Sequence, residues 1–147
     1  MPDAPALHLT AIDSHAHVFS RGLNLASVRR YAPSYDAPLG DYLGQLLAHG
    51  FSHGVLVQPS FLGTDNRYLL SALQTVPGQL RGVVMLERNV ERASLDEMAR
   101  LGVRGVRLNL MGQALPDLTG AEWRPMLERI GEQGWHATVL SREFLAP

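Results

Sequence analysis

Short apolar runs alternate with amphipathic segments along this chain of 147 residues. Continuous apolar stretches are typical of strands that are covered on both faces of a sheet. They occur at 54–58, 81–86, 103–110 and 135–140, and a further one is expected to begin the chain as a buried strand from Leu9 through Ile12. The pattern therefore predicts five strands.

Helical spacing of apolar residues fills the intervals between these runs. Helices are predicted at 39–49, 67–75, 95–101 and 121–133. Glycines follow three of them, and Pro77-Gly78 ends the second. Ser94-x-x-Glu97 and Thr119-x-x-Glu122 have the form of capping boxes that open the last two helices. The second helix has a suitable N-cap in Thr64, Asp65 or Asn66.

Strands that alternate with helices through short turns indicate an α/β fold with a parallel sheet and right-handed crossovers. Polar residues follow the carboxyl ends of three of the predicted strands. They are His15 and His17, then Ser60, then Arg107 and Asn109. Because α/β barrels and open α/β sheets build their sites at that end, we expect these side chains to share one mouth.

A long irregular segment, 18–39, follows the two histidines and is rich in arginine and tyrosine. Connections of this length inside a compact domain are usually functional or disordered. Its position favours a lid or a substrate-binding loop. A plain surface excursion is the alternative.

Composition and charge argue against several classes of function. The chain is 46% hydrophobic and 18% charged with a formal net charge of -1, which gives no electrostatic footprint for nucleic acid or an anionic membrane. It has no cysteine, so thiolate metal sites and disulfides are excluded. Neither a leader-like segment at Met1–Pro5 nor a run long enough to span a bilayer is present, so we expect a cytoplasmic protein.

His15 and His17 are two residues apart at a strand end, so alternation places both rings on one face and Ala16 on the other. Two neutral imidazoles there could share a metal ion, polarise a water or bond a substrate oxygen. Two solvated histidines are the alternative for an isolated His-x-His pair. Arg107 lies in an apolar strand, where a guanidinium would need a carboxylate partner from the substrate or from a salt bridge.

The other polar residues carry weaker signals. Ser60 could bond a carboxylate or end a turn, and no Gly-x-Ser-x-Gly elbow supports it as a nucleophile. Asn109 shares the face of Arg107 and could orient it, whereas Arg104 is expected on the opposite face. Asp65 and Asn66 are expected to cap a helix. His136 is the one further histidine that we keep as a site candidate.

Three blocks together resemble a known family. They are Ile12-Asp13-Ser14-His15-Ala16-His17, the stretch Val57-Gln58-Pro59-Ser60-Phe61-Leu62-Gly63-Thr64-Asp65-Asn66, and Gly102-Val103-Arg104-Gly105-Val106-Arg107-Leu108-Asn109. In this order they resemble the amidohydrolase-related metal-dependent hydrolases, closest to the branch that contains 2-pyrone-4,6-dicarboxylate lactonase.

The resemblance implies a (β/α)₈ TIM barrel with the His-x-His pair at its mouth. It implies that His15 and His17 are catalytic and bind a divalent metal such as Zn or Mn, or act without one as in the lactonase branch. It further implies that Ser60 and Arg107 bind a substrate carboxylate, with Tyr35 assisting. The expected partner is thus a small carboxylated lactone or related carbonyl compound.

The chain departs from the family pattern in three places. Gln113 stands where the dicarboxylate lactonases carry a second arginine, which predicts a different or less charged substrate. Leu140-Ser141-Arg142 stands where relatives often have a histidine after the fifth strand. A barrel needs about 250 residues, so we expect residues 1–147 to be a single truncated domain that lacks strands six to eight and the catalytic aspartate.

Two alternatives remain open beside a lactone hydrolase. One is a metal-dependent decarboxylase of the same superfamily. The other is a non-catalytic half-barrel that binds carboxylates or self-associates through its open sheet edge.

Overall fold

The computed structural model describes residues 7–141, so Met1–Pro5, Arg142 and the chain end at Pro147 lie outside the described residues. Five parallel strands form one sheet in the order β1-β2-β3-β4-β5. Their bounds are β1 Ile12–Ala16, β2 His53–Val57, β3 Leu80–Val84, β4 Val103–Asn109 and β5 His136–Leu140. The predicted parallel α/β sheet is confirmed.

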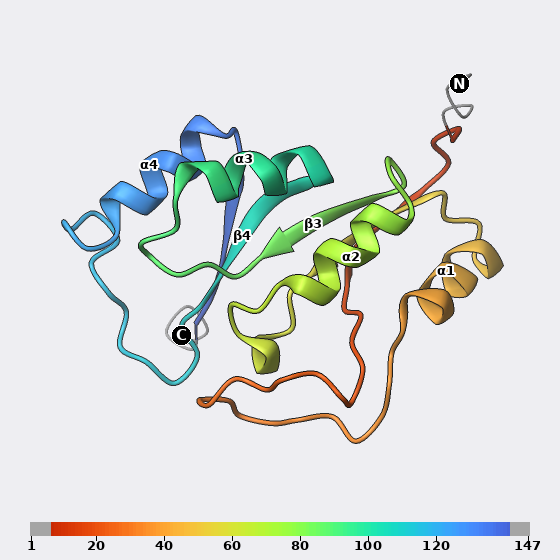
Figure 1. The fold of residues 1–147 in the computed structure, drawn as a ribbon, viewed down its shortest axis with the longest axis horizontal. Coiled ribbons are helices and arrows are strands. Elements are labelled where there is room, and N and C mark those ends of the chain that lie inside the picture. The colour runs from red at the N-terminus through yellow and green to blue at the C-terminus, as the bar shows by residue number, and fades with distance from the viewer. Residues whose placement is uncertain (1–6, 142–147) are drawn as a thin grey trace, which may run out of the picture.

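A helix connects each strand to the next. The helices are α1 Leu39–Ala48, α2 Arg67–Thr75, α3 Arg92–Leu101 and α4 Arg124–Glu132, and a short 3-10 helix, η1 Ser60–Leu62, follows β2. Figure 1 shows the sheet curling with these helices on its outside. The arrangement is that of the first half of a TIM barrel. The sequence pattern missed η1, because three residues are too few to show helical spacing.

The main core lies between the sheet and the helices. Leu56, Val84 and Val106 point to this side from three strands and are 0% exposed. Gly82 lets α2 approach closely, because a Cβ atom there would stand 2.9 Å from Leu69 and Leu73. The apolar runs of β2, β3 and β4 thus reflect burial against the helices.

The opposite, concave face of the sheet is less covered. Ile12 on β1 is 51% exposed and Leu140 on β5 is 39% exposed. The prediction of a buried strand beginning at Leu9 is therefore wrong: β1 begins at Ile12, and Leu9 is 58% exposed. The physical reason is that β1 is an edge strand whose inner face has no layer packed on it within residues 7–141.

Both capping-box predictions are wrong. Helix α3 begins at Arg92, before Ser94, and its first turn is closed by the backbone N–H of Leu95 donating to Glu91. Helix α4 begins only at Arg124. The hydroxyl of Thr119 donates instead to Asp117 (2.6 Å), which forms a local turn ahead of the helix.

The long segment between β1 and α1 runs along the carboxyl end of the sheet (Figure 1). Phe19 and Ala37 pair in an antiparallel bridge, and Arg21 forms an ion pair with Asp36 (3.2 Å). A second, smaller core holds Phe19 and Phe61 edge to face at 5.0 Å. The segment is thereby tied to the loop that follows β2. Within residues 7–141 no helix has the length and apolarity to cross a membrane.

Candidate active site

His15 and His17 lie at the carboxyl end of β1 with their ring centroids 5.0 Å apart and their planes nearly perpendicular. Ala16 points the other way and packs against the main core. The pairing of β1 with β2 shifts between Asp13 and Ala16, so the two rings meet at a bulged strand end. Strand alternation alone would not have shown this irregularity.

The hydrogen bond of His17 defines its tautomer. Its Nδ1 lies 2.7 Å from the carbonyl oxygen of Val57. Because a carbonyl only accepts, Nδ1 carries the proton and Nε2 keeps its lone pair in the neutral ring. Burial is the main cause that lowers the pKa of His17 below its ordinary value, the Val57 bond acts against this, and the charges of His15 and Arg107 lower it further. His17 is thus a neutral base at neutral pH.

Arg107 approaches the same strand end from the other side. Its Nη1 donates to the carbonyl of Gln58 (3.0 Å), the residue after Val57. His17 is thus bound to the carbonyl of the last residue of β2, and Arg107 to the carbonyl of the residue that follows the strand. Burial lowers the pKa of Arg107, and none of the four ion pairs found within residues 7–141 includes this guanidinium. A half-buried cation without a carboxylate partner is suited to receive an anionic ligand.

A cavity of about 450 Å³ opens at this end of the sheet. Ser60 and Arg107 line it together with Asn109 and Gln113. The segment between β1 and α1 contributes Val28, Arg29, Arg30 and Tyr31 to the same cavity. Its size lies within the usual range for small-ligand sites, about 300–1,000 Å³. The two histidines are not among its lining residues, but the charge of Arg107, which lines it, acts on His17.

Asn109 borders two hollows, the cavity just described and a neighbouring one of about 340 Å³ that also contains Arg107 and Trp123. Its Oδ1 is buried and has no hydrogen-bond partner among the described residues. Asn109 was expected to share the face of Arg107 and to orient it; the Arg107 guanidinium donates to the Gln58 carbonyl, and no hydrogen bond joins it to Asn109 among the described residues. An unpaired buried acceptor between two cavities needs a donor from water or ligand.

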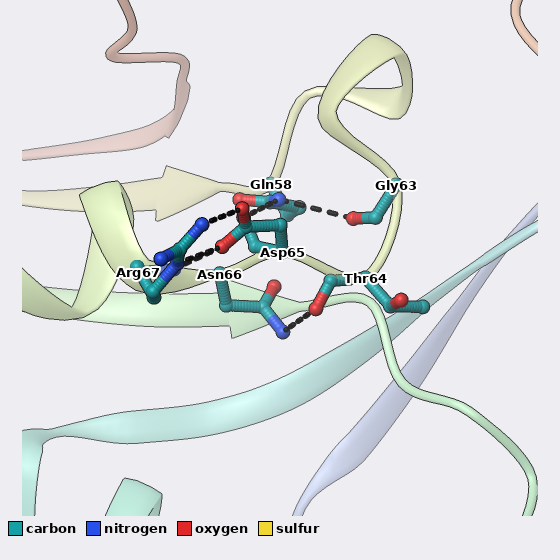
Figure 2. Close-up of polar contacts among 6 residues, drawn as sticks. All are labelled: Gln58, Gly63, Thr64, Asp65, Asn66 and Arg67. Atoms are coloured by element: carbon teal, nitrogen blue, oxygen red, sulfur yellow. Dashed lines mark hydrogen bonds and ion pairs between the residues drawn. The ribbon is translucent and has the colours of Figure 1, made fainter. Parts of the chain in front are cut away.

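Gln58 and Asn66, which the sequence pattern did not single out as a pair, hold the loop that carries Ser60. Figure 2 shows the buried amide of Gln58 reaching across the loop, where its Nε2 donates to the carbonyls of Gly63 (3.0 Å) and Asp65 (2.8 Å). Asn66 Nδ2 donates to Thr64 (3.1 Å). These contacts join backbone carbonyls of the loop that follows β2, so this polar block is structural.

Asn66 is the residue before α2, as expected, but its side chain does not cap the helix. Its amide instead bridges to the end of β3: Nδ2 donates to the Met85 carbonyl (2.8 Å) and Oδ1 accepts from the Met85 N–H (3.1 Å). Asp65 is occupied by an ion pair with Arg67 (2.7 Å). Neither residue faces the cavity that contains Arg107.

Tyr31, rather than Tyr35, lines the cavity. Tyr35 is 57% exposed and its ring packs 5.5 Å from Phe19. A hydrogen bond between the two tyrosines raises the pKa of Tyr31, so Tyr35 is one contact away from the cavity. No periodicity exists in this irregular segment, and the sequence could not discriminate between the two tyrosines.

Two further candidates lie away from the mouth. His136 is at the beginning of β5 and pairs with Gly105, whose missing side chain leaves room for the imidazole. It is thus at the amino end of its strand, four residues before Leu140. Arg104 is exposed and its Nη1 donates to the carbonyls of Ala99 and Val103, which confirms its structural role.

The histidine pair fits a metal ion only in part. The carbonyl bond to Nδ1 of His17 is the type of support that orients metal-bound imidazoles, and it leaves Nε2 available. Zinc sites in proteins take at least three protein ligands. Residues 7–141 contain no group of three or more His, Cys, Asp or Glu side chains arranged to hold a metal. We therefore derive no chemical step through a metal ion.

The arrangement has two chemical capacities that require no further group. The neutral Nε2 of His17 can accept a proton from water or bond a substrate oxygen. The guanidinium of Arg107 can hold a carboxylate or polarise a carbonyl from the adjacent cavity. The charge of Arg107 acts on the His17 ring, so the two side chains lie near each other at this end of the sheet.

Comparison with known proteins identifies relatives that are named as hydrolases. A 2-pyrone-4,6-dicarboxylate hydrolase of Comamonas testosteroni is 32% identical over 142 residues, which cover 94% of this chain and 46% of that protein. A 4-sulfomuconolactone hydrolase of Hydrogenophaga intermedia is 34% identical over 97 residues, which cover 65% of this chain and 32% of that protein.

Among solved structures, a candidate 2-pyrone-4,6-dicarboxylic acid hydrolase from Pseudomonas putida is 88% identical with a TM-score of 0.85. The match covers 92% of this chain and 50% of that one. The chain thus spans half the length, or less, of these relatives. The model of the amidohydrolase family matches residues 12–146, and the half-barrel with its histidine pair agrees with that match. The chain therefore belongs to the amidohydrolase family.

Proposed function

We propose that this chain forms the binding half of a hydrolase for small carboxylated lactones. One observation carries the proposal: the half-buried guanidinium of Arg107 has no carboxylate partner among the described residues and faces a cavity of about 450 Å³ beside two imidazoles. The relatives named as lactone hydrolases support the choice of a lactone.

In this proposal the substrate lies with one carboxylate on Arg107 and Ser60. A bidentate guanidinium contact fixes the plane of that carboxylate, and the Ser60 hydroxyl donates a further hydrogen bond. The lactone carbonyl then lies toward the histidines. His17, neutral because burial lowers its pKa, accepts a proton from water or bonds the carbonyl oxygen, and His15 lies on the same side of the substrate.

Hydrolysis needs an attacking water, a polarised carbonyl and a proton donor for the leaving oxygen. The residues described supply a base and an anion contact. A complete barrel would add groups from its remaining strands, and metal ligands would come from the same source. We propose that Zn²⁺ or Mn²⁺, if used, is bound by His15 and His17 together with such groups.

The test compares the chain alone with a chimera in which it replaces the matching half of the Pseudomonas putida protein. Loss of the pyrone absorbance of 2-pyrone-4,6-dicarboxylate is followed with and without added Zn²⁺ or Mn²⁺. We expect turnover by the chimera. Arg107→Met should lower kcat/KM by about 100-fold, in line with the loss of a bidentate charged contact of about 3 kcal/mol.

Arg104→Met provides the matched control, because it removes the same charge from the same strand away from the cavity. A chimera that folds but hydrolyses neither pyrone nor muconolactone substrates would contradict the proposal. Decarboxylation of the same acids, with a metal retained after dialysis, would favour the decarboxylase instead.

Self-association through the open sheet is a second candidate activity of the chain alone. The exposed Ile12 and Leu140 on the concave face, at the two edge strands, support it. Unpaired strand edges pair readily with other chains. Sedimentation equilibrium tests this candidate: a monomer at all concentrations would contradict it.

A further inference from the structure

Asp13 lies at the irregularity in β1 and faces α1. Its Oδ2 accepts a hydrogen bond from the Tyr42 hydroxyl (3.1 Å), and its Oδ1 accepts from the backbone N–H of His15 (3.3 Å). A carboxylate that accepts from the N–H two residues ahead forms an Asx turn, which bends an extended chain. One side chain thus joins helix α1 to the backbone of the first histidine.

The register between β1 and β2 shows where the strand is bent. Asp13 pairs with Gly54 on β2. Three residues later, Ala16 pairs with Leu56, which is only two residues further along β2. One extra residue on one strand is a β-bulge, and it shifts the alternation of side chains beyond it. The Asx turn of Asp13 spans this extra residue.

The bulge decides the face on which His15 lies. In a regular strand Asp13 and His15, two residues apart, would share a face. Asp13 instead faces α1, and Ala16, three residues later, packs against the core between the sheet and the helices. Alternation around Ala16 therefore places His15 and His17 on the opposite face. The His15 ring is exposed and makes no hydrogen bond to any of the described residues, so its direction depends on its backbone.

Gly54 makes room for the tyrosine that holds Asp13. A Cβ atom at this position would collide with the hydroxyl oxygen of Tyr42. Because Gly54 is opposite Asp13 in the sheet, its missing side chain lets the hydroxyl reach the carboxylate. Burial, the charge of Asp13 and the hydrogen bond to it raise the pKa of Tyr42, so the hydroxyl keeps its proton and donates.

We propose that Asp13 is a positioning residue: it shapes the bulge of β1 so that the His15 ring meets His17, and Tyr42 holds it in place from α1. The inference rests on the proposed function for what the two imidazoles do. It adds the residues that set their relative position, none of which touches the substrate in the proposed reaction.

The contact between the two rings, whose centroids lie 5.0 Å apart, can be followed in the 147-residue chain by nuclear Overhauser effects between ring protons. Asp13→Ala should abolish the contact, because the N–H of His15 loses its acceptor. Asp13→Asn should keep it, since the amide oxygen still accepts from that N–H and the amide nitrogen can donate to the Tyr42 hydroxyl. Tyr42→Phe should weaken it.

Two further variants have matched controls. Tyr68→Phe is the control for Tyr42→Phe, since it removes a hydroxyl on α2 that makes no hydrogen bond to any of the described residues. Gly54→Ala displaces Tyr42 from the side of β2 without changing Asp13, and should weaken the ring contact as Tyr42→Phe does. Gly44→Ala is its control, because a Cβ atom there meets nothing within 4 Å.

Kinetics of the chimera give a second readout that a merely structural role would not move. Asp13→Ala should lower kcat by at least about tenfold, because a reacting group displaced by about 1 Å loses its productive geometry. KM should change little, since the carboxylate contact of Arg107 is kept. Asp13→Asn should restore kcat. A purely structural role would lower stability and leave kcat per folded molecule unchanged.

The inference is overturned if Asp13→Ala keeps the ring contact, if Asp13→Asn loses it, or if Tyr68→Phe weakens it as much as Tyr42→Phe. These outcomes are distinct from those of the proposed function. Loss of the ring contact in Asp13→Ala, together with a wild-type chimera that hydrolyses no lactone, would support the positioning role and contradict the function. Undiminished lactone hydrolysis by the Asp13→Ala chimera would support the function and overturn the positioning role.

Discussion

Two polar regions lie near the carboxyl end of this sheet: the Gln58–Asn66 block and the Arg107–Asn109 pair. They differ in whether their polar atoms have hydrogen-bond partners. Gln58 and Asn66 are 1% and 5% exposed, and their amides bond backbone groups on both sides. Arg107 has one bond to a backbone carbonyl and no carboxylate. Asn109 has a buried Oδ1 without a partner among the described residues.

The difference indicates which polar residues maintain the fold and which await a ligand. A buried polar group that is fully paired contributes to one conformation of the chain. A buried polar group that is left unpaired lowers stability, so its presence suggests another use. The Gln58–Asn66 block is thus structural, and the Arg107–Asn109 pair is the region that we propose for binding.

Asn66→Ala should have the largest effect on folding. It removes the side-chain amide that bonds both the N–H and the carbonyl of Met85, just after β3. Leaving these groups unpaired should lower the free energy of unfolding by about 3 kcal/mol. Urea denaturation measures it, with Asn89→Ala, an exposed asparagine, as the control. A change equal to that of the control would mean that the amide does not hold the two loops together.

Arg107→Met should have the opposite effect: a small change in stability and a large loss of ligand affinity. Its stability should stay within about 1 kcal/mol of the wild type, because the half-buried guanidinium lacks an ion pair among the described residues and the methionine stem keeps its packing. Its affinity for a planar carboxylate should fall by at least about tenfold. Strong destabilisation with unchanged affinity would place Arg107 in the structural group.

His17 should make the chain less stable in mild acid. Its pKa is lowered in the folded chain, chiefly by burial, so the folded state binds a proton less readily than the unfolded state. The stability linked to this group is therefore complete above the ordinary histidine pKa and is lost as the pH falls through the folded value. Melting temperatures between about pH 7.5 and about pH 5 measure it.

His17→Asn should lose less stability over the same range, because the amide can still donate to the Val57 carbonyl but does not titrate. Equal pH dependence in both proteins would assign the effect to other groups. The ring signals of His17 followed by NMR should titrate below the ordinary histidine pKa, because burial lowers the pKa of this ring.

Asn109→Leu should have the smallest effect on stability. Replacing an unpaired buried amide with an apolar side chain of similar size leaves no partner unsatisfied, so the change should lie within about 0.5 kcal/mol. Ligand affinity should nevertheless fall if a ligand or its bound water donates to Oδ1. A loss of several kcal/mol would mean that the Asn109 amide contributes to the stability of the fold.

The fold could be predicted from the sequence because its signals are local. Apolar runs and helical spacing placed every strand and helix within a few residues, and their alternation gave the parallel order. The predictions of helix starts were wrong where other hydrogen bonds replaced the expected cap. Ser94 and Thr119 matched a capping pattern. The first turn of α3 is instead closed by the bond from Leu95 to Glu91, and the Thr119 hydroxyl donates to Asp117 ahead of α4.

The site could be predicted only in part. The positions of His15, His17, Ser60, Arg107 and Asn109 at the carboxyl end of the sheet could be predicted, because strand ends in a parallel sheet meet at one edge. Arg29, Arg30 and Tyr31 were not assigned individually, since they reach the cavity from an irregular segment held by aromatic packing on Phe61. No pattern in the sequence records such a contact.

The central claim is that His15, His17 and Arg107 contact one small anion at a common mouth. Benzene-1,3-dicarboxylate titrated into the isotope-labelled chain, with the two imidazole signals and the Arg107 Nε–H signal followed together, tests it most directly. We predict that all three shift along one binding curve with a single dissociation constant. Arg107 shifting alone, with both imidazole signals unmoved at saturation, would contradict it.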